Sequence, residues 1–138
     1  MIKVLKAGFY ASIQDRGRVG FASKGVPVSG VMDQYSSTIA NSILNNAATA
    51  AVLEITFGGC ELQFLTETIM CISGADFSAK INDELIILNS RIQVQKKDVL
   101  SFGKINYGVR TYLAVKGGFQ SEIILNSRSF YQNITDDF

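Results

Sequence analysis

The residues able to do chemistry in this sequence are carboxylates, amides, hydroxyls and cations, because histidine is absent. Without histidine, the chain has no Ser-His-Asp or Cys-His nucleophilic system and no metal site with imidazole ligands. Its two cysteines, Cys60 and Cys71, are too few for a zinc site made of thiolates alone. No glycine-rich turn leads into the Gly-Lys-Ser/Thr sequence of a P-loop, so ATP is not held by that device.

Many of the remaining polar side chains fall in one segment, residues 12–33, which also contains four glycines and the only proline. Connections between strands usually span about 4–6 residues, so a longer polar segment indicates a loop ordered for binding. Asp15 lies next to Arg16 in this segment, and a loop salt bridge is the alternative explanation for that pair. The donors and acceptors of the segment are Gln14, Asp15, Arg16, Arg18, Lys24, Ser29 and Asp33.

The polar segment leads into a predicted helix from Asp33 to Asn45, where Tyr35, Ile39 and Ile43 recur every four residues with Ala40 and Leu44 beside them. Asp33 is a typical N-cap residue, and asparagine suits the other end. Two interpretations of this helix stay open. Its N-terminus favours an anionic group, although an Asp cap occupies part of that site. Alternatively, the helix plugs the mouth of a β-barrel.

Glu54 stands out because it interrupts the apolar strand predicted over residues 52–57. Alternation places Val52, Glu54 and Thr56 on one face of that strand. If this face is internal, the carboxylate needs a partner, and arginine is the natural one. If the face is external, Glu54 simply points into solvent.

Three further polar positions lie at predicted strand ends or inside strands. Asp76 follows small residues at the end of an apolar run, where either a ligand or a tight turn fits. Arg110 and Tyr112 share one face of the strand predicted over residues 109–115. Lys116 precedes two glycines, a pattern more typical of a turn than of a phosphate cradle.

The elements that position these residues are mostly short strands, spaced by about ten residues, which indicates a barrel or a sandwich. Turn residues at 82–83 and 96–98 predict two hairpins. After residue 129 no closing strand is evident, as expected for a fragment or for half of a larger protein. The predicted strands are 2–6, 52–57, 61–65, 68–73, 77–81, 85–88, 91–94, 99–102 and 109–115.

Composition bounds the class of protein. With 138 residues, 47% of them hydrophobic and 18% charged, the chain can form one domain with a real core. A net charge of +1 without blocks of like charge argues against nucleic-acid and anionic-membrane binding. The apolar runs are too short to span a membrane, no secretory signal is evident, and two reduced cysteines suit the cytoplasm.

Several strings of this sequence, spread over nearly its whole length, resemble one family, the allophanate hydrolase subunit 2 family. That family includes the C subunit of bacterial 5-oxoprolinase, part of the carboxyltransferase region of urea carboxylase, and an antagonist of a sporulation-kinase inhibitor. The strings are SIQDRGRVGF from residue 12, GVPVSGVMD from residue 25, AN at 40, LEIT at 53 with GG at 58, SGAD at 73, GVRTYLA at 108 with GG at 117, and NSRS at 126.

The resemblance implies a mainly β fold, a cyclophilin-like β-barrel with one principal α-helix. Residues 1–138 are then a single domain, the first half of a two-domain protein. The implied function is that of the C subunit in an ATP-dependent 5-oxoprolinase, a hydrolase that opens 5-oxoproline to L-glutamate. The expected partners are a paralogous barrel subunit and a lactam-utilisation subunit. This domain is expected to bind no cofactor itself and to be inactive alone, and ATP is used by the complex.

Two alternatives to the 5-oxoprolinase function stay open. One is a carboxyltransferase that acts on urea or a related small amide with carboxybiotin, and the other is a non-catalytic regulatory binding subunit. For an amide substrate, we expect a pocket with opposing donors and acceptors, in which an arginine pairs with a substrate carboxylate. The predicted catalytic residues are Asp33, Glu54 and Asp15, and the predicted substrate-binding residues are Gln14, Arg18, Ser29, Asn41, Asp76, Arg110 and Tyr112, with no metal ligand.

Overall fold

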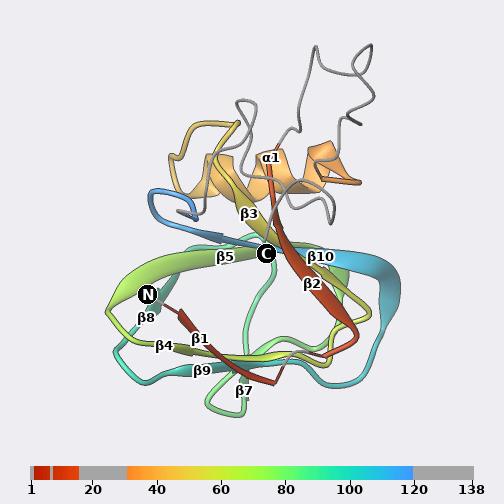
Figure 1. Cartoon of the computed structure of the whole chain (residues 1–138), viewed down its shortest axis with the longest axis vertical. Helices are drawn as coiled ribbons and strands as arrows, with labels where there is room; N and C mark the ends of the chain where they lie inside the picture. The colour runs from red at the N-terminus through yellow and green to blue at the C-terminus, as the bar shows by residue number, and fades with distance from the viewer. Residues whose placement is uncertain (1, 7, 16–30, 120–138) are drawn as a thin grey trace, which may run out of the picture.

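Ten strands and one helix form the described part of the chain, residues 2–6, 8–15 and 31–119 of the computed structural model (Figure 1). The strands make two five-stranded antiparallel sheets. The mainly β class with one helix is therefore confirmed. Among the described strands the two sheets are separate, and no closed barrel is formed.

The first sheet has the strand order β1-β4-β9-β6-β7, and the second has the order β2-β3-β10-β5-β8. The strands of the first sheet are β1 (Ile2–Lys6), β4 (Glu61–Phe64), β9 (Val99–Ser101), β6 (Lys80–Ile81) and β7 (Glu84–Leu85). The strands of the second sheet are β2 (Tyr10–Gln14), β3 (Val52–Thr56), β10 (Tyr107–Val115), β5 (Thr68–Asp76) and β8 (Ile92–Val94).

The elements stack in three layers: the first sheet, the second sheet, and helix α1 (Gln34–Ile43) on the outer face of the second sheet (Figure 1). Leu53 and Leu113 belong to the core between the two sheets, whereas Val52 and Ala114 belong to a smaller core beneath the helix. Both faces of the central strands β3 and β10 are therefore covered. The expected plug in a barrel mouth is wrong, because α1 covers a sheet face, against β5 and β10.

The helix has the predicted ends, and Ala40 and Leu44 of the expected apolar stripe are buried, but the stripe does not extend to the first turn. Asp33 is the N-cap, and Asn45 follows the C-cap with φ 57°. Tyr35, expected in the buried stripe, is 77% exposed. The buried side consists of Ser36, Ser37, Ala40, Asn41 and Leu44. Small side chains let the helix lie close to the sheet, and a Cβ placed on Gly74 would lie 3.5 Å from the Cβ of Ser36.

Strand β2 is the one strand that the sequence did not predict, since its residues 12–14 were assigned to the start of the polar loop. Its sequence, YASIQ, alternates between side chains that face the helix layer and side chains that face the other sheet. The residues facing the helix are polar although they are buried, so the usual apolar signal is missing. Pairing with β3 from Tyr10↔Thr56 to Gln14↔Val52 satisfies the backbone of this strand.

The two predicted hairpin turns have different outcomes. Asn82 and Asp83, with φ values of 50° and 69°, join the paired strands β6 and β7, so this hairpin is confirmed. Lys97 also has a positive φ, 76°, and lies in a turn between β8 and β9. Those strands belong to different sheets, so the second hairpin prediction is wrong. Turn residues indicate a chain reversal but do not determine which strands pair.

Candidate functional site

A row of buried polar side chains crosses the helix-facing side of the second sheet. Ser12 of β2 pairs with Glu54 of β3, Glu54 pairs with Tyr112 of β10, and Tyr112 pairs with Ser73 of β5. Directly opposed residues of antiparallel strands share a face, so the four side chains lie side by side. The exposed fraction of each is 4% or less. Buried polar groups cost free energy unless they are paired, so this row is the strongest candidate for a functional site.

Glu54 and Tyr112 form the centre of the row. The Tyr112 hydroxyl donates to Glu54 Oε2 at 2.8 Å, and the backbone N–H of Met32 donates to the same oxygen at 2.8 Å. The Tyr112 oxygen in turn accepts from the backbone N–H of Asp33 at 2.9 Å. The internal location of Glu54 is confirmed, but the expected arginine partner is replaced by a phenol and a backbone amide.

This arrangement keeps the Tyr112 phenol protonated. Burial, followed by the nearby Glu54 charge and the hydrogen bond to it, raises the pKa of Tyr112 far above its ordinary value of 10. A deprotonated phenol would place a second negative charge against Glu54. Tyr112 is therefore a fixed hydrogen-bond donor throughout the physiological pH range.

Asp33 connects this row to the helix. Its side chain accepts from the Ser36 backbone N–H at 3.0 Å and from the Ser36 hydroxyl at 2.6 Å, so the predicted N-cap is confirmed. These bonds, led by the one from the Ser36 hydroxyl, lower the pKa of Asp33 against the opposing effect of partial burial. The carboxylate thus remains ionised and satisfies the first turn of α1.

The end of β2 adds Gln14 and Asp15 to the same region. Gln14 Nε2 donates to Ser12 Oγ at 2.9 Å, inside the polar row. The Asp15 carbonyl accepts from the N–H of Val31 at 2.8 Å, which joins the two ends of segment 16–30. Two other predicted site residues, Arg18 and Ser29, lie outside the described residues.

Arg110 lies in the next row of the same face, opposite Thr56. It is half-buried, and its guanidinium forms no hydrogen bond or ion pair with any residue that the structure describes. Lys116 directly follows the same strand. Its ammonium group donates to the Leu44 carbonyl at 2.7 Å and so binds the C-terminal end of the helix. Arg110 is therefore the better candidate to meet an anionic ligand.

Two predicted site residues have local structural partners instead. Asn41 Nδ2 donates to the Ala50 carbonyl at 3.0 Å, and this bond connects the helix to the loop that follows it. Asp76 accepts from the Ser78 N–H at 2.9 Å and from Asn106 Nδ2 at 3.2 Å. The tight-turn interpretation of Asp76 is therefore confirmed.

Ser12, Ser73 and Thr56 belong to the polar face but were not predicted as site residues. Each is an ordinary hydroxyl in a strand, and only the register places it beside Glu54, Tyr112 or Arg110. The alternation that placed Thr56 with Glu54 was the available signal. To identify Thr56 as part of the site, one must also know that a helix covers this face of the sheet.

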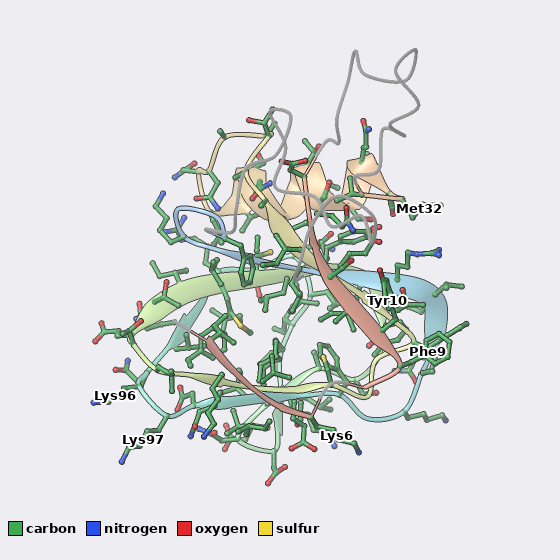
Figure 2. All side chains as sticks on the ribbon, in the orientation of Figure 1. Lys6, Phe9, Tyr10, Met32, Lys96 and Lys97 are labelled. Atoms are coloured by element: carbon green, nitrogen blue, oxygen red, sulfur yellow. The ribbon has the colours of Figure 1, made fainter. Side chains whose placement is uncertain are left out.

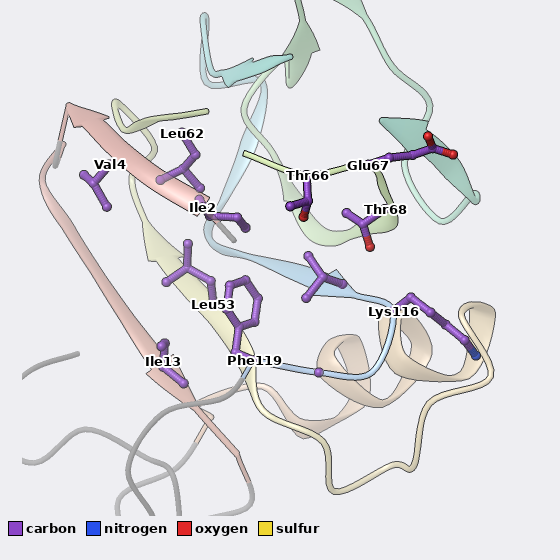
Figure 3. A pocket seen from close by; sticks show the side chains of 12 residues that line it. Ile2, Val4, Ile13, Leu53, Leu62, Thr66, Glu67, Thr68, Lys116 and Phe119 are labelled. Atoms are coloured by element: carbon purple, nitrogen blue, oxygen red, sulfur yellow. The ribbon is translucent and has the colours of Figure 1, made fainter. Parts of the chain in front are cut away.

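The other face of the sheet borders a cavity that opens between the two sheets (Figure 3). Its volume is about 400 Å³. Ile13, Leu53 and Phe119 make its wall apolar, and Glu67 lies at its polar lip. This cavity is therefore chemically distinct from the polar row under the helix.

The described residues contain no cluster of three or more His, Cys, Asp or Glu side chains able to hold a metal ion. Within the same part of the chain, no helix is long and apolar enough to cross a membrane. Both cysteines are buried and free, as expected.

Fold and site together define a two-sheet β domain with a buried acid–phenol pair at the start of its helix. The chain belongs to the carboxyltransferase domain family, subdomain A and B, whose family model matches residues 24–135. This agrees with the resemblance carried by the sequence strings.

Among the relatives, the chain is 43% identical to the urea amidolyase of Lachancea kluyveri over 94% of its length, and this match covers 7% of that protein. It is 33% identical to the C subunit of 5-oxoprolinase from Escherichia coli K12, with 94% of the chain and 42% of the relative covered. The chain thus spans less than half the length of these relatives.

Solved structures give the same result. The urea amidolyase of K. lactis matches 93% of the chain with a TM-score of 0.89 and 43% identity, over 8% of its own chain. TTHA0988 matches 99% of the chain with a TM-score of 0.92 and 28% identity, over 52% of its own chain. The chain therefore resembles parts of longer proteins.

Proposed function

We propose that the chain supplies the amide-binding part of a 5-oxoprolinase, in which other subunits use ATP to open 5-oxoproline to L-glutamate. The observation that carries this proposal is the buried polar row centred on Glu54 and Tyr112, with Arg110 beside it. A domain that needed only stability gains little from a buried ionised group, because apolar residues of similar volume stabilise a core as well or better. Homologues named as the C subunit of 5-oxoprolinase support the substrate.

The chemistry of the site suits a small cyclic amide that carries a carboxylate. A lactam offers one carbonyl acceptor and one N–H donor, which Gln14 and Asp15 can complement with groups of both signs. The carboxylate of 5-oxoproline can pair with a guanidinium through two parallel hydrogen bonds. Arg110 is assigned to that role together with Arg18, and Ser29 and Asp33 complete the rim.

The proposal treats residues 1–138 as one domain of a longer cytoplasmic protein that works with a paralogous barrel subunit and a lactam-utilisation subunit. The E. coli relative is named as one subunit of its enzyme, which supports the existence of partner subunits. ATP is handled by those partners, and the isolated domain is inactive.

Carboxyl transfer to urea is the second candidate, favoured by the 43% identity to a urea amidolyase. In that reaction a separate carrier brings carboxybiotin, and the amide nitrogen of the substrate receives the carboxyl group. Urea itself has no carboxylate, so in this reaction the carboxyl group available to Arg110 belongs to carboxybiotin and not to the substrate. The two candidates therefore differ in what they require of Arg110.

The test uses the full-length protein with its partner subunits. One assay supplies ATP and 5-oxoproline and measures glutamate, and the other supplies a biotin carboxylase, a biotin carrier and urea and measures carboxylated urea. We expect glutamate, and we expect Arg110→Gln to raise the KM for 5-oxoproline by about tenfold or more, since a charge-assisted pair contributes about 1.5–3 kcal/mol.

Lys96→Gln is the matched control, because Lys96 is an exposed cation at the opposite end of the molecule from Met32 (Figure 2). It should leave the KM unchanged. Turnover of urea, with no glutamate formed, would overturn the 5-oxoprolinase assignment in favour of the second candidate.

A further inference from the structure

Glu54 and Tyr112 are poorly placed to touch a substrate. Tyr112 is fully buried and Glu54 is 4% exposed. The Tyr112 oxygen already donates one hydrogen bond and accepts another, and Glu54 Oε2 already accepts two. A substrate could reach these atoms only by displacing backbone groups of the protein. That would leave the N–H of Met32 or of Asp33 without its partner, which is unfavourable.

The atoms that the pair does hold are two consecutive backbone amides. The N–H of Met32 is bound by Glu54 and the N–H of Asp33 by Tyr112, at 2.8 and 2.9 Å. Asp33 is the N-cap of α1, and the preceding Val31 is bonded to Asp15 at the end of β2. The pair therefore fixes the point where the chain enters the helix.

We propose that Glu54 and Tyr112 are positioning residues, which lock the Met32–Asp33 backbone and the start of α1 onto the sheet and so hold the predicted site residue Asp33 in place. Resting on the proposed function, this inference assigns the two side chains an indirect role in turnover. Figure 2 shows Met32 beside the end of the helix and above β2, where such a lock would act. The side chains of Met32 and Tyr35 are 69% and 77% exposed, so packing at this entrance comes from the buried Val31 and not from these two residues.

The neighbouring strand positions supply matched variants. Tyr112→Phe removes one hydroxyl and both of its hydrogen bonds but keeps the ring. Tyr107→Phe removes a hydroxyl from a tyrosine of the same strand that is 59% exposed. Thr111→Val removes a buried hydroxyl that donates to the Ser73 carbonyl at 3.1 Å, without contact to Met32 or Asp33.

The first measurement is amide hydrogen exchange at Met32 and Asp33 in the full-length protein. Tyr112→Phe should speed exchange of the Asp33 amide by about fivefold or more, since a lost hydrogen bond contributes about 1 kcal/mol or more. Tyr107→Phe should leave that rate unchanged, and Thr111→Val should change it no more than it changes amides throughout the sheet. Equal effects of Tyr112→Phe and Thr111→Val would overturn the lock.

The second measurement separates positioning from catalysis. Glu54→Gln keeps an acceptor oxygen for Met32 and Tyr112 but removes the charge, so it should retain slow exchange and most of the kcat. Tyr112→Phe should lower kcat and speed exchange together. An inactive Glu54→Gln enzyme with unchanged exchange would show that Glu54 itself takes part in the reaction, and would overturn the proposal.

Failure of the proposed function gives a different pattern. If the wild-type complex acts on neither 5-oxoproline nor urea, the substrate assignment fails. The exchange rates of Met32 and Asp33 still decide whether the pair locks this segment, because that measurement needs no substrate.

Discussion

The two faces of the sheet β2-β3-β10-β5-β8 are both buried, yet they are built from different residues. The face toward the other sheet carries Leu53, Ile55 and Leu113, and it belongs to the larger apolar core. The face toward α1 carries Glu54 and Tyr112 beside smaller apolar groups. Burial alone therefore does not show which of the two faces mainly stabilises the fold. The apolar face stabilises the domain, whereas the polar face fixes a backbone segment in space.

Leu113→Ala should give the largest loss of stability, because it empties space in the core between the sheets. Leu113 is fully buried, and such truncations cost about 2–5 kcal/mol. Urea unfolding of the wild type and the variant measures this difference. Val109→Ala on the same strand, at a side chain 43% exposed, should cost much less. Equal losses would contradict the assignment of the larger core to this face.

Tyr112→Phe probes the opposite face one residue away and should cost about 1–3 kcal/mol, since it removes one of the two hydrogen bonds to Glu54 and leaves the Asp33 N–H without a partner. The pKa of Tyr112 is raised in the folded state, so its stabilising effect is complete below pH 10 and is lost as the pH rises above 10. The wild type should therefore lose stability more steeply above pH 10 than the variant does. Parallel pH curves, measured by urea unfolding, would show that Tyr112 is not held as described.

Asp33→Ala tests the helix side of the polar face and should cost about 1 kcal/mol, the typical contribution of an N-cap. The pKa of Asp33 is lowered from 3.8, so the stabilisation is present above that pH and is lost as the pH falls below it. Asp33→Asn keeps a capping side chain and removes the charge. Asp33→Asn should have a free energy of unfolding close to that of the wild type at pH 7, and this value should depend less on pH below pH 3.8. A large loss of stability at pH 7 would contradict the capping geometry.

Thiol labelling is expected to show the smallest effect, but it compares the two cores directly, because each core holds one buried cysteine. Cys60 lies in the core between the sheets and Cys71 in the core under the helix. Burial raises the pKa of both thiols to about 11, so at pH 8 each reacts only when its surroundings open. We expect Cys71 to react first, since the helix layer is the smaller core. Mass spectrometry with Cys60→Ser and Cys71→Ser variants assigns the sites, and faster labelling of Cys60 would reverse the ranking.

Local patterns predicted most elements well. Alternation in residues 52–57 gave β3 and placed Glu54 and Thr56 on one face, and Asp33 gave the start of α1. Strand β2 was missed because its buried side chains are polar. The buried side of α1 was only partly predicted, because Ser36 and Ser37 pack on the sheet beside Ala40 while Tyr35 faces solvent. Patterns of hydrophobicity fail where packing selects for size or for hydrogen bonding.

For the candidate site, too, single residues were predicted from local sequence patterns but their long-range partners were not. Glu54 was singled out because a carboxylate in an apolar strand is unusual, and Asp76 was weighed against a tight turn, which it makes with Ser78. The partnership of Glu54 with Tyr112 was beyond reach, since the two residues are 58 positions apart and meet only through the register of β3 and β10.

By itself, the sequence determined the mainly β class, the single helix with its Asp33 cap, the family, and the absence of histidine chemistry. These follow from local propensities, from short motifs and from composition. Only the tertiary structure decided that Glu54 binds Tyr112 and that the pair holds two backbone amides, and that Asn41 and Asp76 serve local structure. The physical reason is that a hydrogen-bond partner is selected by strand register and helix placement, which depend on contacts across the whole chain.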